Sequence, residues 1–216
     1  MPLIGSRIEI CPDGYRRQLT TAIYLAHLNP VTKAHIEIIN ELKRSDKVSV
    51  FPVIFRIDGK EVNSRSFPFS YELRKKMLES VFGDTIAVSS NYTFYSPFAK
   101  YMPPLLSPYS WKIKKQILDG IGTDYFTYTG DKAEAFVLRL YGLHPKIGKR
   151  KETSATFVKQ KMFEAAIGKD TDWEDHIEPE IVKIIRQNWD IIKKFANGSD
   201  LTYRILGMKF PSTGFW

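Results

Sequence analysis

Short apolar runs rich in β-forming residues alternate with helical patterns along most of this chain. The runs lie at about residues 20–27, 47–54, 85–88 and 125–129, and a segment with helical spacing of apolar residues follows each of them. Strands that alternate with helices favour parallel pairing, because each helix carries the chain back to the edge where the previous strand began. We therefore predict an α/β fold with a doubly wound parallel sheet and a helical C-terminal part.

The pattern divides the chain into three parts. Residues 1–19 are mixed and basic and contain a Cys-Pro-Asp-Gly turn signal, so we predict an N-terminal extension. Residues 20–168 hold the alternating pattern and form the predicted α/β domain. Residues 169–216 contain a helix predicted at about 178–196 with an isoleucine-rich stripe, followed by a short aromatic tail. We expect this last part to pack on the same domain.

Two further segments lack a clear pattern. Residues 91–110 are rich in aromatic residues and prolines and are longer than a typical loop, which favours a lid over a ligand or a surface for a partner. Residues 144–152 are basic, and we predict that they are irregular.

Composition narrows the class of protein. The formal net charge of +8 and the pI of about 9.4 imply attraction to polyanions. No apolar run approaches the ~20 residues that span a bilayer, and residues 1–7 lack the apolar core of a signal peptide. The single cysteine, Cys11, excludes an internal disulfide and a multi-cysteine metal site. We expect a cytoplasmic protein without a membrane partner.

The run from Ala26 to His35 joins the first predicted strand to the first predicted helix through an Asn29-Pro30 turn. A strand that turns directly into a helix start points unpaired backbone N–H groups toward one place, which favours an anion such as a phosphate. Thr32 and His35 lie one helical turn apart, so both side chains can face one ligand. The simpler alternative for His35 is a buried histidine on the apolar face of the helix.

A second candidate site precedes a helix that we predict to begin near Ser154. It combines three hydroxyl residues with three cations: Thr153, Ser154, Thr156, Arg150, Lys151 and Lys159. A helix N-cap needs only one hydroxyl. A polyphosphate at a helix N-terminus would use hydroxyls, backbone N–H groups and cations together. An ordinary cap beside a basic loop is the alternative.

Gly130-Asp131 follows the fourth predicted strand and is a weaker signal. Glycine lets a ligand approach the backbone, and a carboxylate at a strand end often holds ribose hydroxyls, although a turn needs the same pair. Arg74 follows Ser70, the predicted N-cap of a helix at about 71–82 that ends before Gly83. Its guanidinium can reach a phosphate or pair with a neighbouring glutamate. The histidines show no metal-ligand spacing, so we predict no metal site.

Taken in order, these segments resemble the nucleotidyltransferase superfamily, the adenylyl- and cytidylyltransferases with an H-x-G-H-like motif. Residues 26–35 are similar to its pattern G-x-F-[DN]-P-x-[HT]-x-G-H, and residues 153–159 are similar to I-S-[SGA]-[ST]-x-[IV]-[RK]. Residues 67–74 resemble the N-P-F-T-x-x-E-R segment of nicotinamide-nucleotide adenylyltransferases of archaeal type. Residues 161–164 and 172–179 resemble their closing M-x-x-G-x-x-W-x-x-x-V-P region.

The resemblance implies a Rossmann-like domain that transfers AMP from ATP to a phosphate-bearing acceptor, nicotinamide mononucleotide, and releases pyrophosphate. It implies three catalytic residues, His35, Thr32 and Lys159. The nucleotide would be bound by residues of the segments described above: His27, Leu28, Asn29, Gly130, Asp131, Arg150, Thr153, Ser154, Ala155 and Thr156. We further predict acceptor contacts from Arg74, Tyr92 and Trp111. Mg²⁺ is expected with ATP, and we expect a homo-oligomer.

Three other functions stay open at this point. A cytidylyltransferase acting on a polyol phosphate would use CTP in place of ATP. A non-catalytic sensor of the same fold would bind a nucleotide and release no pyrophosphate. A nucleic-acid-binding module would show an affinity that falls steeply with salt. The chain contains no RNA-binding motif, so we do not expect nucleic acid as a partner.

Overall fold

A parallel sheet forms the centre of the molecule. The computed structural model describes residues 8–10, 16–18, 20–44, 47–149, 154–199 and 201–216. Within them the sheet consists of β3 (Thr21–Ala26), β4 (Lys47–Pro52), β7 (Ala87–Val88), β9 (Tyr125–Thr129) and β10 (Pro145–Ile147). Their order is β10-β9-β3-β4-β7, and all neighbours are parallel. The chain thus starts in the middle and adds strands on both sides, which confirms the predicted doubly wound, Rossmann-like α/β fold.

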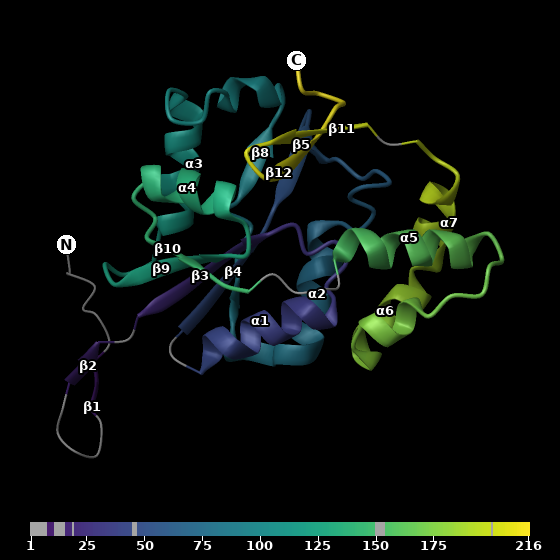
Figure 1. Ribbon diagram of the computed structural model, residues 1–216, viewed down its shortest axis with the longest axis horizontal. Coiled ribbons are helices and arrows are strands. Elements are labelled where there is room, and N and C mark those ends of the chain that lie inside the picture. Colours follow the sequence, from purple (N-terminus) through teal and green to yellow (C-terminus); the bar gives the residue numbers. More distant parts are fainter. Residues whose placement is uncertain (1–7, 11–15, 19, 45–46, 150–153, 200) are drawn as a thin grey trace.

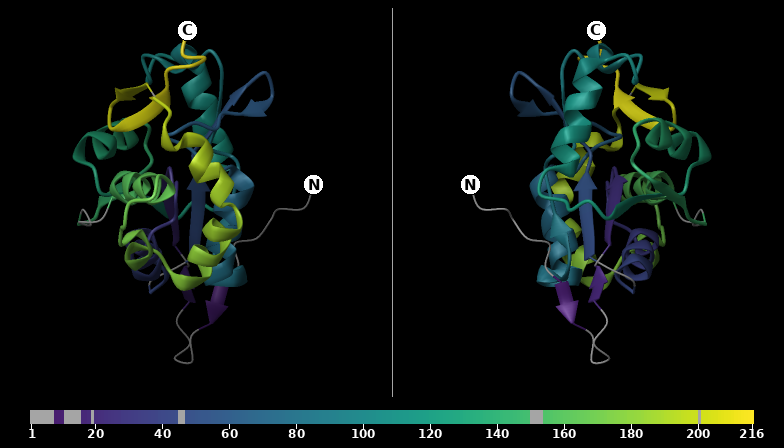
Figure 2. Two further views of the ribbon diagram at one scale, coloured as in Figure 1. Left: turned by 90° about the vertical axis from the view of Figure 1, so that its right-hand side faces the viewer. Right: turned by 90° about the vertical axis from the view of Figure 1, so that its left-hand side faces the viewer.

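Helices cover both faces of this sheet (Figures 1 and 2). One face packs against α1 (Lys33–Lys43), α2 (Tyr71–Phe82), α5 (Ala155–Ala166), α6 (Pro179–Gln187) and α7 (Trp189–Ala196). The other packs against α3 (Pro108–Leu118) and α4 (Lys132–Leu140). In β3, Ala22 and Tyr24 face the first layer, while Ile23 and Leu25 face the second. A strand buried on both faces has to be apolar throughout, which is the run seen in the sequence.

Shorter strands surround the central sheet. β5 (Ile54–Ile57), β6 (Lys60–Glu61) and β8 (Thr93–Tyr95) form a second sheet in the order β6-β5-β8. β1 (Ile8–Ile10) pairs with β2 (Arg16–Gln18), and β11 (Thr202–Ile205) pairs with β12 (Met208–Pro211). Three 3-10 helices complete the described structure: η1 (Gly83–Thr85), η2 (Phe98–Tyr101) and η3 (Trp173–His176). No helix in the described ranges is long and apolar enough to cross a bilayer.

The structure corrects the prediction for residues 91–110. The segment forms β8, η2 and the start of α3, and four of its aromatic residues are buried in the second apolar layer: Tyr92, Phe94, Phe98 and Tyr101. Tyr95 and Tyr109 are exposed. Phe94, Phe98 and Tyr101 lie there with Phe55 and Phe210, and their rings pack edge to face or tilted. The aromatic content therefore reflects a core, because each ring removes a large apolar area from water.

Three other segments differ from the prediction. Residues 145–147 are not irregular but form β10, an edge strand, and a proline is tolerated at its first position. The predicted helix at 178–196 is two helices, because the chain leaves helical geometry at Asn188, whose side chain donates to the Ile184 carbonyl. The tail forms the β11–β12 hairpin.

Candidate active site

The segments that follow β3 and β9 meet at the carboxyl ends of these two neighbouring strands. The strand order reverses there, which is where ligands bind in open α/β sheets. A cleft of about 270 Å³ lies at this point. Its lining includes residues from both predicted motifs and from the β9 end: His27, Leu28, Asn29, His35, Gly130, Ala155, Thr156 and Lys159. The structure thus brings together segments that the sequence predicted to converge.

His35 sits at the third position of α1 and is held by the residue that caps this helix. The Thr32 N–H donates to His35 Nδ1 at 3.1 Å, and the Thr32 hydroxyl lies 3.1 Å from the same nitrogen. Because Nδ1 accepts a hydrogen bond, the neutral imidazole carries its proton on Nε2. Thr32 is fully buried and positions His35 without lining the cleft.

Burial makes His35 and His27 neutral at physiological pH. Desolvation lowers the pKa of His35 to about 4. For His27, desolvation is reinforced by the charges of Lys159 and Arg74, and the pKa falls to about 3. His35 is therefore a neutral hydrogen-bond donor rather than a cation, so any positive charge in the cleft has to come from other residues.

The free energy of unfolding is expected to fall as the pH is lowered from about 6.5 toward 4. An unfolded histidine takes up a proton near pH ~6.5, whereas folded His35 and His27 stay neutral to about pH 4 and pH 3. The unfolded state thus binds more protons in this window, and each histidine makes stability rise with pH by up to about 1.4 kcal/mol per pH unit. Urea unfolding across this range measures the effect.

A His27→Gln variant, which cannot be protonated, should show a smaller loss of stability on acidification. His144→Gln is the matched control because His144 is exposed. An equal pH dependence in wild type, His27→Gln and His144→Gln would contradict the interpretation of His27 as a buried neutral group.

His27 lies at the end of β3 with an imidazole that has no hydrogen-bond partner among the described residues. Both ring nitrogens are buried and unpaired. The ring stacks on Phe67 at a centroid distance of 5.2 Å and lies 6.1 Å from Phe55. A buried polar group without a partner is costly unless a ligand or water satisfies it. His27 therefore offers a donor and an acceptor at the cleft.

Asn29 lines the cleft but already has two partners. Its Nδ2 donates to the Phe69 carbonyl at 2.8 Å, and its Oδ1 accepts from the Phe69 N–H at 3.1 Å. These bonds join the turn after β3 to the segment before α2. The Leu28 backbone adopts a left-handed φ of +52° in this turn. Asn29 thus shapes the wall of the cleft by holding two loops together.

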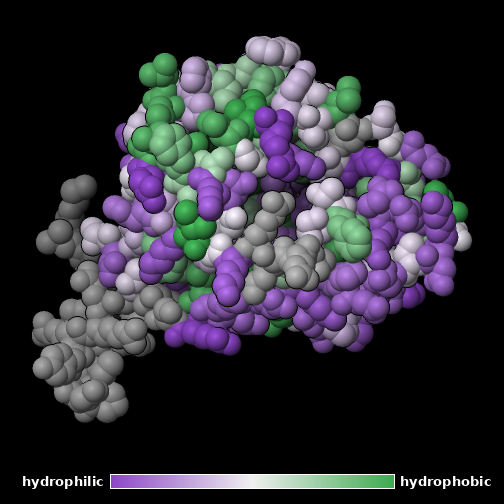
Figure 3. All heavy atoms as spheres, viewed as in Figure 1, coloured by the Kyte–Doolittle hydropathy of each residue, from purple (hydrophilic) through white to green (hydrophobic). Residues whose placement is uncertain are grey.

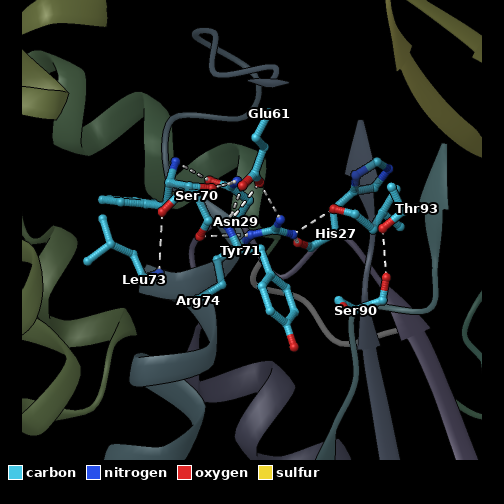
Figure 4. Close-up of polar contacts among 11 residues, drawn as sticks. His27, Asn29, Glu61, Ser70, Tyr71, Leu73, Arg74, Ser90 and Thr93 are labelled. Carbon is cyan, nitrogen blue, oxygen red and sulfur yellow. Dashed lines mark hydrogen bonds and ion pairs between the residues drawn. The ribbon is translucent and has the colours of Figure 1, made fainter. Parts of the chain in front are cut away.

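Arg74 does not reach the cleft, which corrects its predicted contact with an acceptor. Its Nη1 donates to the carbonyls of His27 at 2.7 Å and Val53 at 2.8 Å, and its Nη2 pairs with Glu61 at 3.1 Å. Figure 4 shows the guanidinium between the Glu61 carboxylate and the His27 carbonyl. The residue is only 2% exposed. The guanidinium of Arg74 thus holds together the ends of β3 and β4 beneath the cleft, through hydrogen bonds to the His27 and Val53 carbonyls.

Lys159 and the N-terminus of α5 form the second side of the cleft. The helix begins where it was predicted, and Ser154 caps it by accepting from the Phe157 N–H at 3.2 Å, as in the alternative of an ordinary cap. Lys159 lies one turn later, is 8% exposed, and donates to the Ser66 carbonyl. Arg150 and Thr153 lie outside the described residues. Ser154, Thr156 and Lys159 line a hollow that adjoins the cleft.

Asp131 is occupied as the N-cap of α4 and does not line the cleft. Its Oδ1 accepts from the N–H groups of Ala133 at 2.8 Å and Glu134 at 3.1 Å. Gly130 and Glu134 do line the cleft. Burial raises the pKa of Glu134, whose carboxylate accepts from the Thr129 hydroxyl at 2.5 Å. Among the described residues, the acidic side chain that lines the cleft is thus Glu134, which the sequence did not indicate.

An apolar cavity of about 100 Å³ adjoins the cleft. Leu25, Tyr92, Glu134 and Met208 line both, so Tyr92 lies at the boundary between the two. Trp111 lines neither, because its Nε1 donates to the Leu105 carbonyl and its ring packs on Tyr141. Figure 3 shows hydrophobic side chains gathered on this side of the molecule, over α3 and the segment before it.

Four cleft residues come from the C-terminal hairpin and were not predicted from the sequence: Arg204, Gly207, Met208 and Lys209. The tail carries a detectable hairpin signal, because Leu206-Gly207 stands between two runs of alternating polarity. That signal predicts two paired strands but not the surface on which they pack.

Known structures confirm the fold. No protein-family model and no curated protein matches the chain. A bifunctional NMN adenylyltransferase/ADP ribose pyrophosphatase from Francisella tularensis superposes with a TM-score of 0.60 and 17% identity, over 82% of this chain and 52% of that one. A protein described as a nicotinate-nucleotide adenylyltransferase from Vibrio parahaemolyticus superposes with a TM-score of 0.54 and 13% identity, over 82% of this chain and 96% of that one.

A third structure, a NadR protein in complex with NAD and AMP-PNP, gives a TM-score of 0.51 and 16% identity, over 78% of this chain and 46% of that one. The chain therefore spans about half the length of the first and third of these proteins. At these identities the likeness shows a shared fold, and the activity has to be argued from the cleft.

Proposed function

We propose that this chain is a nucleotidyltransferase that transfers AMP from ATP to the phosphate of an acceptor, nicotinamide mononucleotide, and releases pyrophosphate. The observation that carries the proposal is His35, a neutral imidazole with its proton on Nε2, in one cleft with Lys159 and the N-terminus of α5. Two structural neighbours, described as adenylyltransferases of NMN and of nicotinate nucleotide, support the same reaction.

In this reaction an acceptor phosphate oxygen forms a bond to the α-phosphorus of ATP, and the bond to the β-phosphate oxygen breaks. Pyrophosphate leaves with that electron pair. His35 Nε2–H donates to an α-phosphate oxygen, where negative charge increases in the transition state. Lys159 and the α5 N-terminus, with Ser154 and Thr156, bind the phosphates that leave. Phosphoryl chemistry of this kind depends mainly on positioning and electrostatic stabilisation.

The described residues contain no group of three or more histidine, cysteine or carboxylate side chains that could hold a metal ion. Mg²⁺ enters the proposal as the counter-ion of ATP, bound through phosphate oxygens. We assign no step of the reaction to it.

Pyrophosphate release with Mg²⁺·ATP and nicotinamide mononucleotide is expected to require both substrates. The assay is run beside CTP with the same acceptor, CTP with a polyol phosphate, and ATP without an acceptor. Turnover only with CTP and the polyol phosphate would replace the proposal by a cytidylyltransferase. ATP binding without pyrophosphate release for any acceptor would identify a sensor and overturn the proposed transfer.

A further inference from the structure

Two cations face each other across the C-terminal hairpin. In the β11–β12 register, Arg204 lies directly opposite Lys209. Like charges at directly opposed positions of an antiparallel pair are destabilising. Within the described part of the chain, neither side chain has a hydrogen bond or an ion pair that would compensate the other. The hairpin therefore contains an uncompensated repulsion between Arg204 and Lys209, which a single substitution at either position would remove.

The hairpin is fixed in place over the cleft. Phe210 of β12 is 1% exposed and packs against Phe55 and Phe94 in the second apolar layer. The turn consists of Leu206 and Gly207, with φ values of +48° and +89°. A Cβ on Gly207 would lie 3.5 Å from the Asp131 carboxyl group, so the turn contacts the start of α4. Figure 1 shows the hairpin beside β5 and β8.

This placement brings the two cations to the phosphate side of the site. Arg204 and Lys209 line the same cleft as His27, His35 and Lys159. Lys209 also lines the adjoining hollow with Ser154 and Thr156 of the α5 N-terminus. Both charges contribute to the lowered pKa of His27, after burial and the charges of Lys159 and Arg74.

We propose that the β11–β12 hairpin is part of the nucleotide site. In this proposal Arg204 and Lys209 bind oxygens of the β- and γ-phosphates on the side of the cleft opposite Lys159. This inference rests on the proposed function, because it names the residues that hold the leaving pyrophosphate of that reaction. A polyphosphate between the two cations converts their repulsion into two favourable charge-assisted contacts. The unpaired imidazole of His27 lies in the same cleft and can donate to the same ligand.

The test separates anion binding from stability by changing the sign of one charge. Arg204→Glu places a carboxylate opposite Lys209, so the hairpin gains an attractive cross-strand pair. The thermal midpoint is therefore expected to stay the same or rise. The affinity for pyrophosphate, measured by titration calorimetry on the full chain, is expected to fall about 10-fold to 100-fold, the range for loss of a hydrogen bond to a charged group.

Lys209→Met is the second variant, because it removes the charge and keeps most of the apolar stem. It should weaken pyrophosphate and ATP binding by a similar factor and raise the KM for ATP more than it lowers kcat. Lys169→Ala is the matched control, since Lys169 is exposed in the loop after α5, outside the cleft.

Two outcomes overturn the inference. In the first, the Arg204→Glu and Lys209→Met variants bind pyrophosphate with the affinity of the wild type. In the second, the wild type does not bind pyrophosphate at all. The proposed transfer can fail independently. If both variants lose affinity while no acceptor supports turnover in wild type, the polyphosphate site stands and the transfer reaction does not. If the wild type catalyses the transfer and both variants match its activity and its affinity for pyrophosphate, the transfer reaction is supported and the role of the hairpin is not.

Discussion

His35→Ala is expected to lower kcat by about 10²–10³-fold, the typical cost of removing one donor that stabilises charge in the transition state. The imidazole is neutral, and its Nδ1 is committed to the Thr32 N–H, so the missing group is a hydrogen-bond donor on Nε2 rather than a charge. The KM for ATP should change less than kcat, because Lys159 and the α5 N-terminus still bind the nucleotide. Steady-state pyrophosphate release measures both constants.

His144→Ala is the control for this experiment, because His144 is exposed and lies outside the cleft. His35→Gln tests the same idea from the other side: its side-chain amide retains an N–H donor, so it should lose less activity than alanine. Circular dichroism should show all three variants folded. Wild-type kcat in a folded His35→Ala protein would refute the role assigned to His35.

Arg74→Ala is expected to lower the free energy of unfolding by about 3–5 kcal/mol, the cost of breaking a buried ion pair by removing one partner. The substitution leaves the buried carbonyls of His27 and Val53 without their donor and the Glu61 carboxylate without its cation. These carbonyls lie at the ends of β3 and β4, so the loops that form the cleft lose a common support. Urea unfolding followed by fluorescence measures the change.

Lys75→Ala, the next position on α2, is the matched control. Lys75 pairs with Glu79 at 3.6 Å, but the two side chains are 37% and 50% exposed, and exposed pairs of this kind contribute about 0–1 kcal/mol. Lys75→Ala should therefore be nearly neutral. If Arg74→Ala and Lys75→Ala cost the same, the guanidinium does not have the supporting role described here.

The sequence predicted the parts of the fold that depend on local patterns. The helix at residues 71–82 begins after Ser70 and ends before Gly83, because a hydroxyl N-cap and a glycine with φ of +52° set its limits. The doubly wound sheet was also predictable, since alternating strands and helices leave few other arrangements. The convergence of the residues after β3 and β9 follows from the topology alone.

Tertiary partners explain what could not be predicted. Arg74 was predicted as a possible phosphate ligand because the sequence around it does not show that β6 places Glu61 beside it. The aromatic residues at 91–110 looked like a lid because nothing local reveals that Phe210 packs against them from the C-terminal hairpin. The charges of Arg204 and Lys209 could be counted but not located, since a hairpin pattern carries no information about the surface it covers.

The position of the hairpin in the chain has a consequence for the newly made protein. A ribosome releases β11 and β12 after every strand of the central sheet. The sheet and its helices can therefore form while the cleft still lacks one wall, and a nascent chain at that stage has His35 and Lys159 without Arg204 and Lys209. On the proposal above, the phosphate site is thus complete only once residues 202–211 have followed the central sheet out of the ribosome.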